Sequence, residues 1–135
     1  MEDEKIFVGQ ITQKAILKYK NSFVILREEG SKETWILPGG RLNVDETTKE
    51  GLLREVREEL SVDCKIDRIL SAEVRNHGKN KLQKLFVFYY AEVLPNQKIV
   101  TNNEIVDIAY VSKKEDLEKY KMHENQRVIL EQFLD

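Results

Sequence analysis

Residues 40–62 have the sequence GRLNVDETTKEGLLREVREELSV, and this stretch decides the fold. Apolar residues recur at helical spacing over 47–60, so we predict a helix there. The residues expected on its buried face are Leu53, Val56 and Leu60, with Leu52 at the margin. Asp45 or Thr47 is expected to cap the start of the helix. One face of the helix is thus assigned to a core, and the others are open to solvent or to a ligand.

A second face of this helix carries Glu55, Glu58 and Glu59 at positions i, i+3 and i+4. Like charges at this spacing repel by about 0.2–0.5 kcal/mol per pair. A divalent cation would offset that repulsion, and Mg²⁺ prefers oxygen ligands and bridges carboxylates to phosphates. The helix alone fits two interpretations, a metal site and a solvated acidic face with surface ion pairs, and the solvated face is the commoner one.

The residues before the helix favour the metal site. The apolar segment Trp35-Ile36-Leu37 runs into Pro38-Gly39-Gly40, which interrupts regular structure. The two glycines allow unusual backbone conformations and a close approach to a ligand. Glu46 stands between this loop and the helix.

The stretch 40–62 resembles the signature of the Nudix hydrolase family. That signature is a glycine, five residues, a glutamate, seven residues and then Arg-Glu-apolar-x-Glu-Glu-x-Gly-apolar. The matching positions here are Gly40, Glu46, Arg54-Glu55-Val56, Glu58-Glu59 and Val62. Ser61 departs from it, because the family glycine is expected to end the helix in the left-handed conformation. A serine that keeps this conformation costs about 1–2 kcal/mol, and otherwise the helix must end differently.

The resemblance implies a fold and an activity. The fold is α/β (α+β), a Nudix-type α/β/α sandwich in which a mixed sheet is flanked by helices. The activity is Mg²⁺-dependent hydrolysis of a diphosphate bond in a nucleoside diphosphate linked to another group, with Mn²⁺ as a substitute cation. Water attacks a phosphorus atom while the metal neutralises the developing charge.

The same resemblance assigns roles to residues of the stretch. Glu55 and Glu59 are expected to bind the metal, together with the backbone carbonyl of Gly39. Glu58 is expected to be a further ligand or to orient the attacking water. Arg54 is expected to hold the glutamates through charge-assisted hydrogen bonds.

Four other residues complete the expected site. Glu46 is expected to tie the loop to the helix. In related proteins a loop glutamate near the position of Glu104 binds metal or activates water, and a solvated loop carboxylate is the equal alternative. Arg27 follows an apolar run and could reach a phosphate, and Gly40 would let the substrate approach the backbone.

The rest of the chain alternates strand and turn signals before it ends in helical ones. We predict strands over 8–18, 22–28, 66–75, 84–94 and 104–111, and helical segments over 113–119 and 123–134. A polar turn is expected at 75–81. This order suggests a mixed sheet with helices on both faces.

Composition narrows the functional class. The chain has 135 residues, 41% of them hydrophobic, a formal net charge of −2 and one cysteine. We expect a single domain over 1–135 and a cytoplasmic location, because neither an apolar signal segment nor a membrane-length apolar run is present. The charge lacks the basic footprint of nucleic-acid binders, which disfavours a nucleic-acid partner. The partner that the family resemblance implies is a small nucleotide. The apolar strand 84–94 fits either the core or the interface of a homodimer, since dimers are common in the family.

The substrate is left open among related nucleotides. A (deoxy)nucleoside triphosphate is the default, with a nucleotide sugar or a dinucleotide as alternatives. A non-catalytic nucleotide-sensing module is a further alternative. Such modules usually lose glutamates of the signature, whereas this chain keeps Glu55, Glu58 and Glu59.

Overall fold

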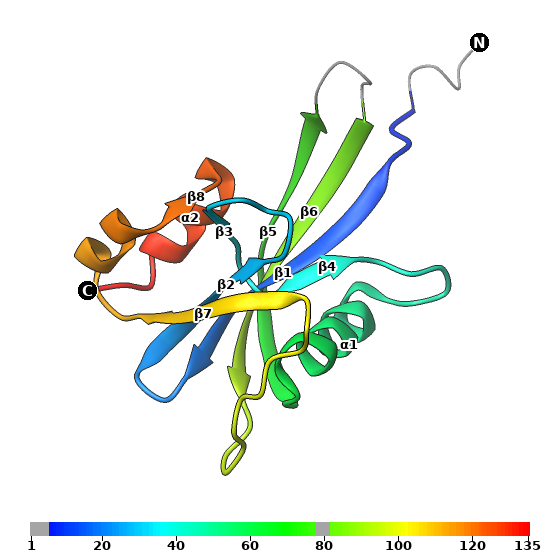
Figure 1. The fold of residues 1–135 in the computed structure, drawn as a ribbon. Coiled ribbons are helices and arrows are strands. Elements are labelled where there is room, and N and C mark those ends of the chain that lie inside the picture. The colour runs from blue at the N-terminus through cyan, green and yellow to red at the C-terminus, as the bar shows by residue number, and fades with distance from the viewer. Residues whose placement is uncertain (1–5, 78–81) are drawn as a thin grey trace.

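The computed structural model describes residues 6–77 and 82–135, and shows a mixed β-sheet with helical layers on both faces (Figure 1). This confirms the predicted fold class. The strand bounds are β1 Gln10–Tyr19, β2 Ser22–Glu28, β4 Gly39–Arg41, β5 Cys64–His77, β6 Leu82–Val93 and β7 Ile105–Val111. They run in the order β5-β6-β1-β2-β7, and β4 also pairs with β1. The sheet is mixed because β1 and β6 are parallel, whereas the other pairs are antiparallel.

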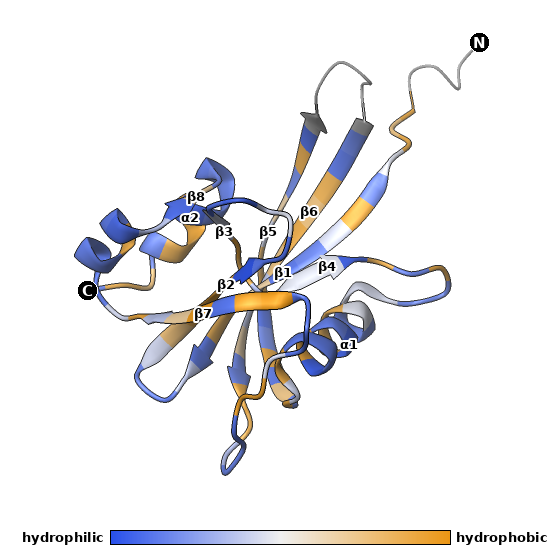
Figure 2. Cartoon of the chain, viewed as in Figure 1, coloured by the Kyte–Doolittle hydropathy of each residue, from blue (hydrophilic) through white to orange (hydrophobic). Residues whose placement is uncertain are grey.

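Two hydrophobic cores lie on opposite faces of this sheet. On one face packs the helix α1 (Thr48–Leu60), whose Leu52, Val56 and Leu60 meet alternate residues of β1, β2 and β6. On the other face pack the 3₁₀ helix η2 (Lys114–Lys119) and the helix α2 (Glu124–Glu131), around Phe88 and Leu130. In Figure 2 much of α1 is coloured hydrophilic, as expected of a helix that gives only one stripe to a core.

The buried stripe of α1 differs from the prediction by a small rotation. Leu52 is fully buried, whereas Leu53 is only partly buried, so their predicted roles are exchanged. Glu59 lies two turns after Leu52 and three residues after Val56, and therefore shares their face. The rotation buries the Glu59 carboxylate at the edge of the sheet instead of leaving it in solvent, with 5% of the residue exposed.

Several predicted boundaries change. Gly39 and Gly40 were expected to interrupt regular structure, but they belong to β4, which pairs with β1. The predicted helix at 113–119 is a 3₁₀ helix, and the one at 123–134 ends at Glu131. A two-stranded sheet of β3 (Thr34–Trp35) and β8 (Lys121–Met122) was not predicted, because pairs this short depend on tertiary contacts.

The remaining findings concern the predicted turn, the cysteine and membrane-length helices. Residues 78–81 of the predicted polar turn lie outside the described residues. Cys64 is buried, and burial raises the pKa of its thiol to about 11, which suits the packing role of a small apolar side chain. In the described part of the chain, no helix has the length and apolar character needed to cross a bilayer.

Candidate active site

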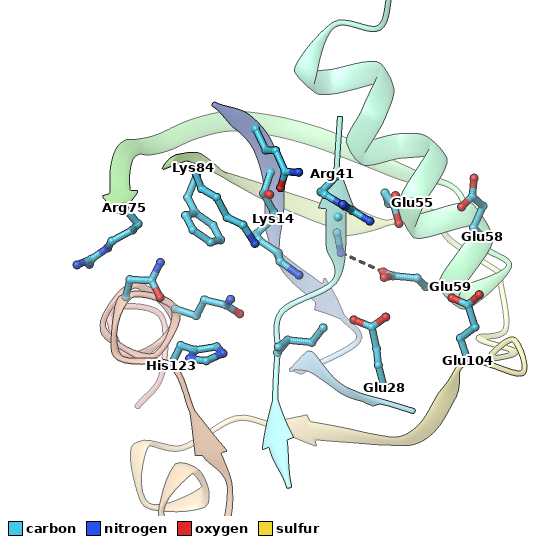
Figure 3. Close-up of a pocket in the computed structure, with 18 of the residues that line it drawn as sticks. Lys14, Glu28, Arg41, Glu55, Glu58, Glu59, Arg75, Lys84, Glu104 and His123 are labelled. Carbon is cyan, nitrogen blue, oxygen red and sulfur yellow. Dashed lines mark hydrogen bonds between the residues drawn. The ribbon is translucent and has the colours of Figure 1, made fainter. Parts of the chain in front are cut away.

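A pocket of about 780 Å³ opens where β4 leaves β1 and the face of α1 turns toward the sheet edge. Residues of β1, β4, β6 and α1 line it, together with the start of α2 and the loop before β7. Figure 3 shows two sides. Carboxylates gather on one side, those of Glu28, Glu55, Glu58, Glu59 and Glu104. Lys14, Lys84 and Arg75 lie on the other side of β4.

The start of α1 is fixed by a capping box. Thr47 is the N-cap and its hydroxyl accepts a hydrogen bond from the Glu50 N–H at 3.1 Å, while the Glu50 carboxylate accepts one from the Thr47 N–H at 2.8 Å. Of the two predicted caps, Thr47 is therefore the one used. The box satisfies two backbone donors that the first turn would leave unpaired, so the register of the glutamates further along α1 is defined.

Gly51 lets α1 lie close against β1. A Cβ at this position would stand 2.6 Å from Nε2 of Gln13 and 2.8 Å from Cδ1 of Leu42. Gln13 is fully buried under the helix, and its amide has no hydrogen-bond partner among the described residues. A glycine inside a helix costs about 1 kcal/mol relative to alanine. The close approach explains why glycine is present despite that cost.

Arg54 joins the loop before α1 to the glutamates of α1. Its Nε and Nη2 donate to the two Glu46 carboxylate oxygens at 2.6 and 3.0 Å. Its Nη1 donates to Glu55 at 2.9 Å and to Glu58 at 3.2 Å, and Nη2 also reaches the Arg41 carbonyl at 3.1 Å. The hydrogen bonds from Arg54 lower the pKa of Glu46. One guanidinium therefore fixes three carboxylates, as planar bidentate geometry allows.

The two glycines of β4 face the carboxylates of α1. The Gly39 N–H donates to Oε1 of Glu59 at 3.0 Å. A Cβ on Gly40 would lie 2.6 Å from the carboxylate carbon of Glu55, so glycine is required for this approach. The first contact holds Glu59 against the β4 backbone, and the missing side chain at Gly40 leaves room for the Glu55 carboxylate.

Burial sets the protonation of the carboxylates. Desolvation raises the pKa of Glu59 to about 8, although Lys14 and the Gly39 N–H act in the opposite direction. Desolvation also raises the pKa of Glu55, and Arg54 opposes that shift. Burial therefore favours the protonated form of both carboxylates, and a bound cation would favour the ionised form.

The donor set fits a divalent cation that binds oxygen. Among residues 6–77 and 82–135, no three His, Cys, Asp or Glu side chains already converge into a ready-made cluster. Two of the carboxylates bind protein donors instead, Glu55 the Arg54 guanidinium and Glu59 the Gly39 N–H. Mg²⁺ needs no such cage, because it is bound by one or two carboxylates, waters and substrate phosphates. The carboxylates on the pocket wall meet that requirement.

The structure brings most of the predicted site residues together. Besides the glutamates of α1, Gly39, Gly40 and Glu104 line the pocket. Glu104 is placed by a loop in which its N–H donates to the Asn102 side chain at 2.9 Å, and the Asn102 side chain donates to the Glu58 carbonyl at 2.9 Å. The loop before β7 is therefore attached to the end of α1.

Arg27 is placed elsewhere. It is not among the residues that line the pocket; its guanidinium donates to the Lys32 carbonyl at 3.2 Å and lies over the Trp35 ring. The next residue, Glu28, lines the pocket instead. Consecutive strand residues point to opposite faces, so only one of the two can face the site.

Lys14 was missed in the sequence. It lies in β1 with 6% of its surface exposed, and its Nζ donates to the Leu37 carbonyl at 3.1 Å. Desolvation lowers the pKa of its ammonium. The sequence did contain a signal for Lys14. It precedes the apolar run Ala15-Ile16-Leu17 within one predicted strand, and a lysine in a buried strand is unusual.

The one departure from the signature keeps the family geometry. Ser61 follows α1 with φ 59° and ψ 31°, in the left-handed region, and its N–H donates to the Arg57 carbonyl at 3.0 Å. The helix therefore ends as a glycine-capped helix does, with a serine in the strained position.

Comparisons with known proteins agree with this geometry. A family model described as the NUDIX domain matches residues 14–133. The nucleoside triphosphatase NudI of Klebsiella pneumoniae (strain 342) is 30% identical over 106 residues, which cover 73% of this chain and 74% of that protein. The 8-oxo-dGDP phosphatase NUDT18 of Homo sapiens is 38% identical over 64 residues, or 45% of this chain, and the match spans only 20% of that protein's length.

A solved structure extends the agreement to the whole fold. The MutT protein from Methanosarcina mazei Go1 superposes with a TM-score of 0.74 at 25% identity, covering 92% of this chain and 91% of that one. Three glutamates of the signature lie on a capped helix beside two glycines, and the whole signature falls within the residues 14–133 that the family model matches. The chain therefore belongs to the Nudix family.

Proposed function

We propose that this chain is an Mg²⁺-dependent pyrophosphohydrolase that cleaves a diphosphate bond in a nucleotide, most directly a (deoxy)nucleoside triphosphate. The observation that carries the proposal is the set of glutamates on one side of the pocket, which Arg54, Gly39 and Gly40 hold in position. A nucleotide substrate is supported by the activities named for two relatives, a nucleoside triphosphatase and an 8-oxo-dGDP phosphatase.

The positions of the residues suggest which of them bind the metal and which hold the metal ligands in place. Glu55, Glu59 and the Gly39 carbonyl would hold the cation, with Glu58 as a further ligand. Bound Mg²⁺ supplies charge neutralisation at the phosphoryl oxygens. Arg54 keeps Glu55 and Glu58 from turning into solvent.

A base is needed to orient or deprotonate the attacking water. Glu58 and Glu104 are the two candidates. Glu58 is exposed, whereas Glu55 is partly buried and Glu59 is buried, and Glu104 lies on a loop attached to α1 by Asn102. A carboxylate with free oxygens can accept a proton from water within hydrogen-bond reach. Both line the pocket.

The experiment is a product analysis with Mg²⁺ or Mn²⁺ on nucleoside triphosphates, nucleotide sugars and dinucleotides. We expect a nucleoside monophosphate and pyrophosphate from a triphosphate, and no turnover in excess EDTA. Glu58→Gln and Glu59→Gln should each abolish metal-dependent turnover. Lys113→Gln, remote from the pocket, is the control and should retain it.

Three outcomes would contradict the proposal in different ways. Unchanged turnover in both glutamine variants would refute the site. Turnover of nucleotide sugars alone would refute the substrate. Tight nucleotide binding without turnover of any compound would favour a nucleotide-sensing module.

A further inference from the structure

The side of the pocket opposite the glutamates carries lysine and threonine side chains. Thr12 and Lys14 on β1 and Lys84 on β6 form what we call the lysine wall. Figure 3 shows its two lysines. In the parallel register Gln10 is opposite Lys84 and Thr12 is opposite Phe86. Paired residues of neighbouring strands point to the same face, so the three polar side chains emerge on one side of the sheet, away from α1.

Lys14 is buried with most of its hydrogen-bonding capacity unused. An ammonium carries three donors, and the Leu37 carbonyl takes one of them at 3.1 Å. Within the described residues Lys14 forms no ion pair, although Glu59 and Glu28 are near enough to act on its charge. Burying an ammonium whose donors are not all used is unfavourable, and an anionic ligand within reach would supply acceptors for the two remaining donors.

Thr12 adds a second unused group. Its hydroxyl is buried and has no hydrogen-bond partner in the part of the chain that the structure describes. It lies two residues before Lys14, on the same face of β1, and lines the same pocket. Buried polar atoms in folded proteins nearly always have a partner, so an unpaired one beside an unpaired ammonium points to a missing ligand.

Lys84 brings a like charge to the same place. It is partly buried, lines the pocket and lies close enough to Lys14 to repel its charge. Glu124, at the start of α2, also lines the pocket but pairs with neither lysine. Two ammonium groups that share one wall, and that form no ion pair with the described carboxylates, can be held there favourably by an anionic ligand with several acceptor oxygens.

We propose that the lysine wall binds a phosphoryl group of the nucleotide directly, without a metal, on the opposite side of β4 from the metal-binding glutamates. The inference rests on the proposed function for the identity of the ligand. The substrate then spans β4: one part of its phosphate chain is held through the cation on the glutamates, and another phosphoryl group accepts hydrogen bonds from Lys14, Lys84 and Thr12.

The test separates the lysine wall from the metal site by removing the metal. Binding of inorganic pyrophosphate and of dGTP is measured by titration calorimetry in excess EDTA, where no hydrolysis occurs. Lys14→Met and Lys84→Met should each weaken binding by at least about tenfold, since charge-assisted hydrogen bonds of this kind change affinity by that factor or more. Lys18→Met, on the same strand but outside the pocket, is the matched control and should stay within about twofold.

A structural role for Lys14 is tested separately. Methionine keeps the length of the side chain without its charge, so the melting temperature of Lys14→Met without ligand should equal or exceed that of the wild type. A lower melting temperature would mean that the bond to the Leu37 carbonyl stabilises the fold, and it would remove Lys14 from the proposal. In that case the binding measurement on Lys84→Met still tests the lysine wall, because Lys84 is partly exposed and its substitution affects the fold less.

The outcomes distinguish this inference from the proposed function. Wild-type affinity in both lysine variants would overturn the lysine wall while leaving hydrolysis untouched. Lysine-dependent binding of pyrophosphate in a protein that hydrolyses nothing would keep the lysine wall and overturn the hydrolase. Equal losses in all three variants, Lys18→Met included, would reduce the effect to general surface charge and overturn the inference.

Discussion

Replacing Ser61 by glycine is expected to stabilise the fold by about 0.5–1 kcal/mol. Ser61 holds φ 59° and ψ 31°, a conformation that costs a residue with a Cβ about 1–2 kcal/mol. Glycine removes that strain but gives the unfolded chain more freedom, which offsets about 0.4–1 kcal/mol. The serine side chain is exposed and forms no hydrogen bond with the described residues, and the backbone bond from its N–H to the Arg57 carbonyl does not depend on it. The difference is therefore a net gain.

Urea and thermal unfolding measure this difference. We expect the urea midpoint to rise with an unchanged slope, and the melting temperature to rise by about 2–4 °C for a domain of this size. Ser61→Ala is the control, because it removes the hydroxyl and keeps the Cβ, and it should stay within about 0.5 kcal/mol of the wild type. A glycine variant no more stable than the alanine variant would refute the strain at this position.

Three other predictions concern the helix α1. Gly51→Ala should destabilise the fold by about 1–3 kcal/mol, because the new Cβ would overlap Gln13, although alanine has the better helix propensity. Urea unfolding measures this, and equal midpoints for the variant and the wild type would contradict it. In the Arg54→Lys variant the lysine cannot bridge Glu46 and the glutamates of α1. The value of kcat/KM or the Mg²⁺ affinity should therefore fall about 10–100-fold while the fold is retained. Wild-type kinetics would count against the positioning role of Arg54. Glu59 has a pKa raised from 4.5 to about 8 in the folded state, so the stability it contributes is full below pH 4.5 and is lost as the pH rises through about 8. In EDTA, Glu59→Gln should therefore match the wild type near pH 5 and exceed its melting temperature near pH 9, and parallel pH profiles would refute the shift.

The helix α1 was predictable because its signals are local. Helical periodicity, the Thr47 cap and the spacing of the glutamates each depend on residues within two turns, so the sequence alone located the helix to within one residue. Its rotation was not predictable at that accuracy. Leu52 and Leu53 are both apolar, and only the contact with β1, β2 and β6 decides which of them is buried.

The missed features are those that depend on distant partners. β4 is three residues long and exists because Thr12, Gln13 and Lys14 pair with it. β3 and β8 come together across most of the chain, and neither has a hydrophobic pattern of its own. Arg27 and Glu28 are adjacent in the sequence, and only the face of β2 that meets the pocket decides that Glu28 lines it and the predicted Arg27 does not.

The sequence by itself determined the family, the mixed α/β class and the three glutamates on one helix, because residue identity at fixed spacing along a helix fixes which side chains are neighbours. Only the tertiary structure decided that Glu59 is buried and Glu58 exposed, and that Glu28 faces the pocket. It also decided that Lys14 is buried across β4 from the glutamates, where it forms no ion pair with any described residue. Burial and charge proximity arise from the packing of elements far apart in the chain, and those long-range contacts set the protonation and the binding chemistry of the site.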